Sequence, residues 1–331
     1  MKKVLVTGGS SYISKHCISQ LLEKGYEVRT TLRDLNKADE IKYDLKKFLN
    51  KEFEIEFFEA DLIEDKGWNE AIDGCDAIFH LAGPFPFEVK VSEEEQIAPH
   101  VDGTLRILEI SKKNNVNRIV MISSIAAAYM GEPGETNIDE TKWTNENTKG
   151  IDAYTKSIVL KEKAAWKFVE KNNSIKLTVI NPPVVLGPGV GKPTKTGSLV
   201  LFKKLITKEL PVAPPFKQGM VDVRDVAKMF LGALENDNTI GERIFVAEGT
   251  YWVKDFCQML IDIGHKAPTF TPPIFLVKFL SNFDKGLKQI LPLLGVDMEI
   301  NTDIAKTLLN FKPIPIKETN KETSDYISSH D

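Results

Sequence analysis

Residues 4–14, VLVTGGSSYIS, decide the fold of this 331-residue chain. The first three form a short apolar run typical of a buried strand, and a turn of glycine and serine follows them. A glycine-rich turn between a strand and a helix presents backbone N–H groups and the positive end of the helix dipole to a pyrophosphate. The segment therefore predicts the first strand, turn and helix of a dinucleotide-binding sheet.

The turn departs from the usual small-residue spacing at two positions. Ser11 and Ser14 stand three and six residues after Gly8, where the T-G-x-x-G-x-x-G pattern has glycine or another small residue. A Cβ at Ser11 would crowd the pyrophosphate, and a positive φ there would cost roughly 1 kcal/mol relative to glycine. We therefore expect Ser11 to weaken cofactor binding without abolishing it. The expected contacts of the turn are Thr7, Gly8, Ser10, Ser11, Tyr12 and Ile13.

The first half of the chain alternates β-type runs with amphipathic segments. This rhythm is typical of an α/β protein with a doubly wound parallel sheet, the Rossmann arrangement. Several of the runs are apolar throughout, as expected when helices cover both faces of the sheet. Besides residues 4–6, the expected strands are 27–32, 54–58, 77–81, 119–122 and 177–180.

The strand and helix rhythm breaks after Gly187-Pro188-Gly189. We predict an NADP-binding domain over residues 1–189 with a return near 219–248, where residues 243–246 rejoin the sheet. A smaller C-terminal substrate lobe should comprise residues 190–218 and 249–331. The polar tail after Pro315 should form a surface helix that frays.

Composition and charge limit the classes of partner that we expect this protein to bind. A formal net charge of −4 gives no reason to expect nucleic acid. The apolar run 274–280 is too short for a membrane span, and a strand that begins at residue 4 leaves no room for a signal peptide. The three cysteines have neither metal-ligand nor disulfide spacing. We expect no metal and no membrane partner, and a cytoplasmic location.

The residues after the second expected strand favour NADP(H) over NAD as the cofactor. Arg33 follows that strand beside the expected position of the adenosine ribose, and its guanidinium suits a 2′-phosphate, with Lys37 as a second cation. Asp34 could instead accept the ribose hydroxyl of NAD, so both cofactors stay open, with NADP(H) favoured. Asp61 and Leu62 should meet the adenine edge, and Ala82 should line the cofactor channel.

Two hydroxyl groups are candidates for carbonyl chemistry. The strand 119–122 ends at Ser123-Ser124, at the sheet edge where ligands of open α/β sheets bind. Tyr154 begins an amphipathic helix further along the chain. A hydroxyl at a ligand-binding edge can donate a hydrogen bond or a proton to a substrate oxygen. An ordinary strand end and a core tyrosine are the competing interpretations.

Taken in order, these motifs resemble the extended short-chain dehydrogenases, in the branch of dihydroflavonol 4-reductase, cinnamoyl-CoA reductase and methylglyoxal or aldehyde reductase. The resemblance implies a Rossmann domain with a C-terminal substrate lobe, NADPH-dependent reduction of a carbonyl, Ser124 and Tyr154 as catalytic residues, and cofactor contacts from Tyr154, Pro182 and Pro183. The segments that carry it are 28–34 (VRTTLRD), 74–82 (GCDAIFHLA), 101–104 (VDGT), 121–124 (MISS), 181–188 (NPPVVLGP) and 221–227 (VDVRDVA).

One residue departs from the family pattern. The family has a lysine four residues after the tyrosine, and this position is Ile158. A cation about 5 Å from the phenol, at an effective dielectric near 20, contributes roughly 3 kcal/mol, or about two pKa units. Without it we expect Tyr154 to titrate near 10 and any activity to favour reduction, which uses the protonated phenol. Lys156 lies on the other side of the helix, and we expect Lys161, two turns away, not to substitute.

Three functions therefore compete. The first is an NADPH-dependent reductase of a small, largely apolar aldehyde or ketone, with activity that the missing lysine could weaken. The second is a catalytically impaired NADP(H)-binding regulatory protein, and the third is a sugar-nucleotide epimerase or dehydratase. Phe85, Phe87 and Met130 are expected around an apolar substrate. The sequence specifies neither the substrate nor the oligomeric state.

Overall fold

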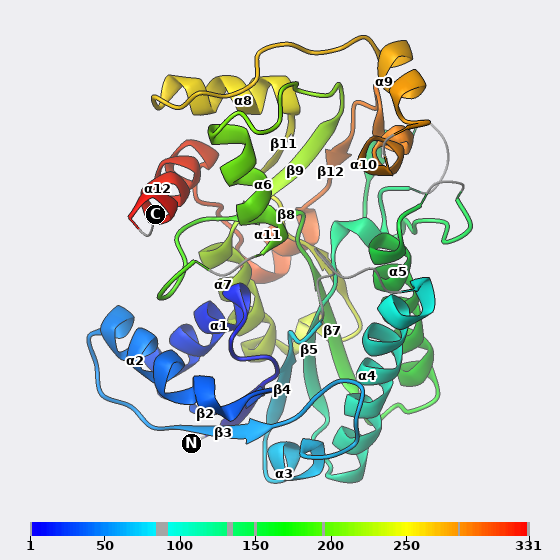
Figure 1. Ribbon diagram of the computed structural model, residues 1–331. Coiled ribbons are helices and arrows are strands. Elements are labelled where there is room, and N and C mark those ends of the chain that lie inside the picture. Colours follow the sequence, from blue (N-terminus) through cyan, green and yellow to red (C-terminus); the bar gives the residue numbers. More distant parts are fainter. Residues whose placement is uncertain are drawn as a thin grey trace.

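The structure is a computed structural model of the chain. It describes residues 2–83, 92–130, 135–148, 151–193, 196–283 and 285–329. Figure 1 shows a large sheet flanked by helices, with a smaller lobe above the carboxyl ends of its strands.

The described residues form a parallel sheet of seven strands in the order β10-β7-β5-β4-β1-β2-β3. The order reverses between β1 and β4, and open α/β sheets bind ligands at such a switch point. The predicted doubly wound α/β class is confirmed. The strands are β1 (Lys3–Val6), β2 (Glu27–Leu32), β3 (Ile55–Glu59), β4 (Ala77–His80), β5 (Arg118–Ile122), β7 (Lys176–Asn181) and β10 (Arg243–Phe245).

Helices cover both faces of this sheet, which explains why several strands are apolar throughout. Val4 and Val6 of β1 belong to one buried cluster, whereas Leu5 belongs to another, because successive side chains of a strand point to opposite faces. In Figure 1 the first face carries α1 (Tyr12–Glu23), α2 (Ala38–Leu49) and α7 (Val223–Glu235). The other carries α3 (Trp68–Ile72), α4 (Glu93–Lys113) and α5 (Ala153–Glu170).

The smaller lobe is built from chain segments on both sides of β10. One sheet has the order β11-β9-β8, and a short parallel pair joins β12 to β6. The strands are β6 (Asn137–Ile138), β8 (Val184–Leu186), β9 (Lys217–Asp222), β11 (Gly249–Trp252) and β12 (Glu299–Ile300). The helices are α6 (Gly197–Ile206), α8 (Val253–Asp262), α9 (Ile274–Leu280), α10 (Lys285–Gln289), α11 (Asp303–Leu309) and α12 (Ile316–Ser328). Single 3₁₀ turns are η1 (Leu35–Lys37), η2 (Ile125–Ala127), η3 (Asp237–Thr239) and η4 (Leu291–Leu293).

The C-terminal helix α12 is held more firmly than a fraying surface helix. Thr323 Oγ1 accepts a hydrogen bond from the Gly187 backbone at 2.7 Å, and the Thr319 hydroxyl donates to the buried Asp222 at 2.9 Å. Threonines on one face therefore fix the helix to the chain around β8 and β9. The predicted helix after Pro315 is present, but the expectation that it lies on the surface and frays is wrong, because the polar composition concealed this buried, hydrogen-bonded face.

Among the helices of the described residues, none is long and apolar enough to cross a membrane. The same residues contain no group of three or more acidic, histidine or cysteine side chains placed to hold a metal ion. The cysteines Cys17, Cys75 and Cys257 are buried as free thiols.

Candidate active site

The turn after β1 does not impose the strain expected at Ser11. Ser11 is the N-cap of α1 with an extended backbone (φ −77°), and its Oγ accepts a hydrogen bond from the Ser14 backbone at 3.2 Å. Serine is among the preferred N-cap residues and caps normally have this backbone conformation. The left-handed residue of the turn is instead Gly8 (φ 71°). The strain argument was therefore wrong, because it placed the positive φ at the wrong position.

The turn passes so close to β2 and to the end of β4 that only glycine fits at positions 8 and 9. A Cβ at Gly8 would lie 3.2 Å from the Ala82 Cα, and one at Gly9 would lie 2.1 Å from the Thr30 Oγ1. Thr7 is fully buried, and its Oγ1 accepts hydrogen bonds from the Leu81 and Ala82 backbones at 3.0 and 2.9 Å. Thr7 thus joins β1 to the chain after β4. It is not among the residues that line the two cavities beside this turn.

A first cavity of about 270 Å³ opens beside this turn, at the carboxyl ends of β1, β2 and β3. Arg33 lines it, whereas Lys37 is exposed outside it. Asp34 is not part of its lining and accepts a hydrogen bond from the Asn36 backbone at 3.0 Å as the cap of η1. The predicted residues in the lining are Gly8, Ser10, Ser11, Arg33, Asp61, Leu62 and Ala82.

A second cavity of about 690 Å³ adjoins the first, since Ser11, Leu81 and Gly83 line both. The predicted residues in its lining are Ser11, Tyr12, Ile13, Ser124, Tyr154, Pro182 and Pro183. Residues from distant parts of the chain therefore meet around two adjoining cavities beside the N-terminus of α1. This arrangement suits an elongated ligand with its phosphates at the helix end.

Ser124 and Tyr154 are brought into direct contact in the wall of this second cavity. The two side chains share a hydrogen bond. Ser124 follows β5 and caps η2 by accepting from the Ala126 backbone at 3.2 Å, while Tyr154 is the second residue of α5. Asp152 caps α5 by accepting from the Thr155 backbone at 2.9 Å, which fixes where the helix begins. Strand end and helix start thus point their hydroxyl groups at one another.

Burial raises the pKa of Tyr154 above the ordinary tyrosine value, and the nearby Tyr129 and Asp152 raise it further. The hydrogen bond from Ser124 works in the opposite direction but is the smaller effect. The expectation of a pKa near 10 was therefore wrong, because it considered the missing lysine and neglected desolvation. At neutral pH the phenol is protonated and available as a proton donor.

Comparison with known proteins identifies the family. Residues 4–247 match the NAD dependent epimerase/dehydratase family. The chain belongs to this family. One similar protein is cinnamoyl-CoA reductase CAD2 of Medicago truncatula. It is 35% identical to this chain over 249 residues, and the match covers 73% of this chain and 75% of that protein. Dihydroflavonol 4-reductase of Dianthus caryophyllus is 33% identical over 263 residues, 78% of this chain and 72% of that protein.

A solved structure extends the likeness to the whole chain. Yeast methylglyoxal/isovaleraldehyde reductase Gre2, complexed with NADPH, matches with a TM-score of 0.80 and 25% identity, over 99% of this chain and 100% of that one. The predicted resemblance to the reductase branch of the epimerase/dehydratase family, and the Rossmann fold that it implied, are confirmed.

A buried polar network behind Ser124 was not predicted. Glu162 is fully buried and accepts hydrogen bonds from the Ser123 hydroxyl, from Asn181 Nδ2 at 2.8 Å and from Arg243 Nε. Asn181 Nδ2 also donates to the Ser124 carbonyl at 3.2 Å. The hydroxyl of Ser123 is therefore occupied within the network, and that of Ser124 faces the cavity. Sequence reasoning treated Ser123 as a neighbour and had no signal that linked Glu162 to Arg243.

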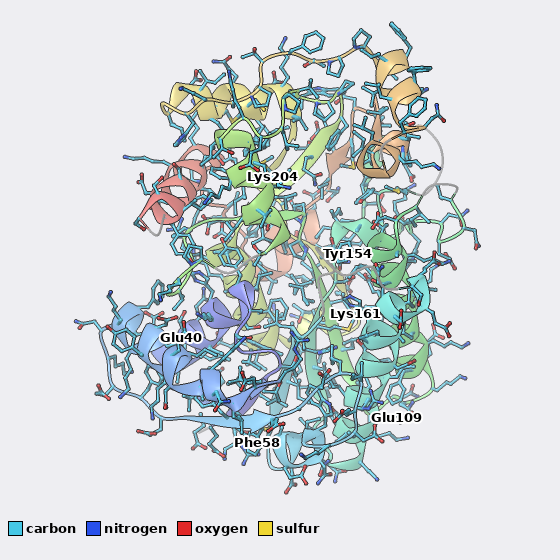
Figure 2. The ribbon with its side chains drawn as sticks, in the orientation of Figure 1. Glu40, Phe58, Glu109, Tyr154, Lys161 and Lys204 are labelled. Atoms are coloured by element: carbon cyan, nitrogen blue, oxygen red, sulfur yellow. The ribbon has the colours of Figure 1, made fainter. Side chains whose placement is uncertain are left out.

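Two residues of α5, Ile158 and Lys161, lie in the wall of the second cavity together with Tyr154. Ile158, at the lysine position, is 4% exposed and packs in an apolar cluster with Ala127 and Val159 while lining the second cavity. Lys161 lines the same cavity, is 2% exposed, and its Nζ donates to the Ile122 carbonyl at 2.8 Å. Figure 2 shows Tyr154 and Lys161 along the same helix, on the side nearest the strands. The structure thus brings to the site a lysine that the sequence did not select.

The expected substrate residues are only partly accounted for. Phe85 and Phe87 lie outside the described residues. Met130 is buried and does not line the cavity, whereas its neighbour Tyr129 does. His100, which no motif singled out, also lines it, with its ring 6.4 Å from that of Tyr154.

Proposed function

We propose that this protein is an NADPH-dependent reductase that acts on the carbonyl of a small, largely apolar aldehyde or ketone. The observation that carries the proposal is the hydrogen bond between Ser124 and Tyr154 in a cavity that Ser11 of the glycine-rich turn also lines. Both hydroxyl groups lie where a carbonyl oxygen could accept hydrogen bonds from them together.

The residues present fit NADPH. A Cβ at Gly8 would lie only 3.2 Å from the Ala82 Cα, so a glycine lets the turn pass close to the chain after β4 at the switch point. Ser11 caps α1 and lines both cavities, which suits the pyrophosphate, and Arg33 in the first cavity suits a 2′-phosphate. When bound, the cofactor supplies a hydride for the carbonyl carbon.

The chain's own residues supply the proton. Ser124 would hold the substrate oxygen, and the Tyr154 hydroxyl would donate its proton as negative charge develops on that oxygen. Asn181 fixes the backbone of Ser124, and Glu162 in turn holds Asn181. The pair is therefore positioned by a rigid, buried framework rather than by mobile side chains.

The cavity lining favours a small, uncharged substrate. Apolar side chains from β8 and α6 line it, including Val184, Val185 and Leu201. Among the described lining residues Lys161 is the one charged side chain, and it lies at the β5 end. A sugar nucleotide would bring two phosphates, which proteins usually bind with several arginines, lysines or backbone donors. The lining therefore supports a carbonyl reductase over an epimerase or dehydratase.

The proposal is tested by NADPH consumption with a panel of aldehydes and ketones. We expect turnover with short branched or aromatic aldehydes, and none with UDP-sugars as substrates for epimerisation. Tight NADPH binding without consumption across the panel would instead support a regulatory NADP(H)-binding protein, the alternative that Ile158 favours.

Arg33→Ala is expected to remove most of the preference for NADPH over NADH. Loss of a charge-assisted contact to phosphate costs roughly 1.5–3 kcal/mol, or about ten- to a hundredfold in affinity. Calorimetric titration of both cofactors checks this, with Lys37→Ala as the matched control, since Lys37 lies outside the cavity. Equal affinity of the wild type for NADPH and NADH would defeat the assignment.

Alcohol oxidation is expected to be strongly favoured by high pH. Oxidation needs the Tyr154 phenolate, and burial raises the pKa of this phenol, so the phenolate is scarce at neutral pH. At saturating NADP the rate of oxidation should rise about tenfold per pH unit up to pH 10 without a plateau. A plateau near pH 7 in the measured rate would show that another group lowers the pKa.

A further inference from the structure

Lys161 is a buried charged residue in the cavity wall that has no part in the proposed proton transfer. It lies seven residues after Tyr154 on α5, two helical turns along the same face. Side chains of a helix lean toward its N-terminus, so Lys161 reaches back toward the part of the cavity occupied by Tyr154 and Ile158. Its Nζ contacts the carbonyl of Ile122, the residue that precedes the Ser123-Ser124 pair.

A purely structural role explains this lysine poorly. An ammonium group has three N–H donors, and among the described residues the Ile122 carbonyl is its one hydrogen-bond partner. Burial of an ammonium with so few partners is costly, and an apolar residue would pack α5 onto β5 without that cost. Two donors remain for a ligand in the cavity that the side chain lines.

The same cavity lacks a hydrogen-bond donor at position 158, where this chain has an isoleucine. In the family that this chain resembles, the resemblance implies that the lysine at that position holds the nicotinamide ribose, and the isoleucine that lines the cavity here offers no side-chain hydrogen bond. We propose that Lys161 binds the nicotinamide ribose in this protein, taking over from α5 the cofactor contact that Ile158 cannot make. This inference rests on the proposed NADPH site and adds a residue to it.

The surroundings of Lys161 make its charge sensitive to pH. Burial lowers the pKa of Lys161 to about 8, and Glu162 beside it works in the opposite direction. His80 of β4 also faces this charge, and its own pKa is lowered mainly by burial, with Lys161 and His100 adding to the effect. Tyr12, Tyr129, Tyr154 and His100 are the remaining titratable groups among the described residues of the cavity wall. As the pH rises through about 8, Lys161 loses its proton and its charge-assisted contact with the cofactor.

The test is the affinity for NADPH between pH 7 and pH 9.5, measured by calorimetry on the wild type and on lysine variants. We expect wild-type affinity to weaken as the pH rises above about 8. Lys161→Met, which keeps the length of the side chain, should bind NADPH about ten- to a hundredfold more weakly at pH 7 and show no such pH dependence. Lys161→Arg should restore affinity at pH 7 and keep it at pH 9.5, because arginine stays charged.

Lys156→Met provides the matched control on the same helix. Lys156 pairs with Glu93 and does not line the cavity, so its loss should leave affinity and pH dependence unchanged. Wild-type affinity that is flat over this range would overturn the proposal, as would Lys161→Met within threefold of wild type or Lys161→Arg no tighter than Lys161→Met. These outcomes would leave the reductase function standing, whereas a wild type that binds no NADPH would remove both.

Discussion

Replacement of Tyr154 by phenylalanine is expected to lower the rate of carbonyl reduction by about 10²- to 10⁴-fold, the usual contribution of a general acid. The ring is kept, so the apolar contacts of α5 persist, while the proton donor and its hydrogen bond with Ser124 are lost. NADPH affinity should change by no more than about fivefold on this account, since a single neutral hydrogen bond contributes about 1 kcal/mol or less. Steady-state rates with the best aldehyde of the panel measure the effect.

Tyr129→Phe is the matched control for this change. Tyr129 lines the same cavity, and burial raises its pKa to about 12, so it is also a protonated phenol in the site. Its side chain hydrogen-bonds with Thr155 and not with Ser124. We expect the Tyr129 variant to keep its rate within about fivefold. Equal losses in the two variants, or none in Tyr154→Phe, would show that the proton comes from another group.

Arg243→Ala is expected to destabilise the protein by roughly 3–5 kcal/mol, because it leaves the carboxylate of Glu162 buried without its cation. Arg243 Nε donates to Glu162, and Nη1 donates to the carbonyls of Glu140 and Lys142 at 2.6 and 2.8 Å. The guanidinium also stacks on Trp143, with its Cζ 3.8 Å from the ring centroid. One side chain therefore ties β10, α5 and the segment after β6 together behind Ser124.

Urea denaturation followed by circular dichroism measures this loss, and an exposed ion pair serves as its control. Lys42 and Glu54 form a surface pair in which Glu54 is 91% exposed, and such pairs contribute about 0–1 kcal/mol. Lys42→Ala should therefore change the free energy of unfolding by less than about 1 kcal/mol. A similarly small change in Arg243→Ala would mean that the buried network does not hold the site together.

The order and type of the main elements could be predicted because they depend on local patterns. Strand β2 occupies the predicted residues 27–32, and Gly25, which follows α1, has the positive φ (83°) common in glycines at helix ends. The apolar runs predicted a sheet with helices on both faces. The predicted return of residues 243–246 to this sheet appears as β10, which pairs with β7. Each of these features is set within a few residues of sequence.

The errors arose where the answer depends on residues far apart in the chain. The backbone of Ser11 is set by its role as a helix cap, and the strained position moved to Gly8. The pKa of Tyr154 depends on burial between α5 and the end of β5, which no spacing reveals. Helical geometry alone placed Lys161 two turns from Tyr154, and only the shape of the cavity brings both into one wall.

Transfer of deuterium from C4-deuterated NADPH to a carbonyl compound tests the central claim most directly. The purified protein would be mixed with both 4-deuterated epimers of NADPH in separate reactions with an aldehyde, and the alcohol analysed by mass spectrometry. The account predicts that one epimer gives deuterated alcohol with wild type and that Tyr154→Phe forms it at least about a hundredfold more slowly. Alcohol without deuterium from either epimer, or no alcohol although NADPH is bound, would contradict the claim that this protein is a carbonyl reductase.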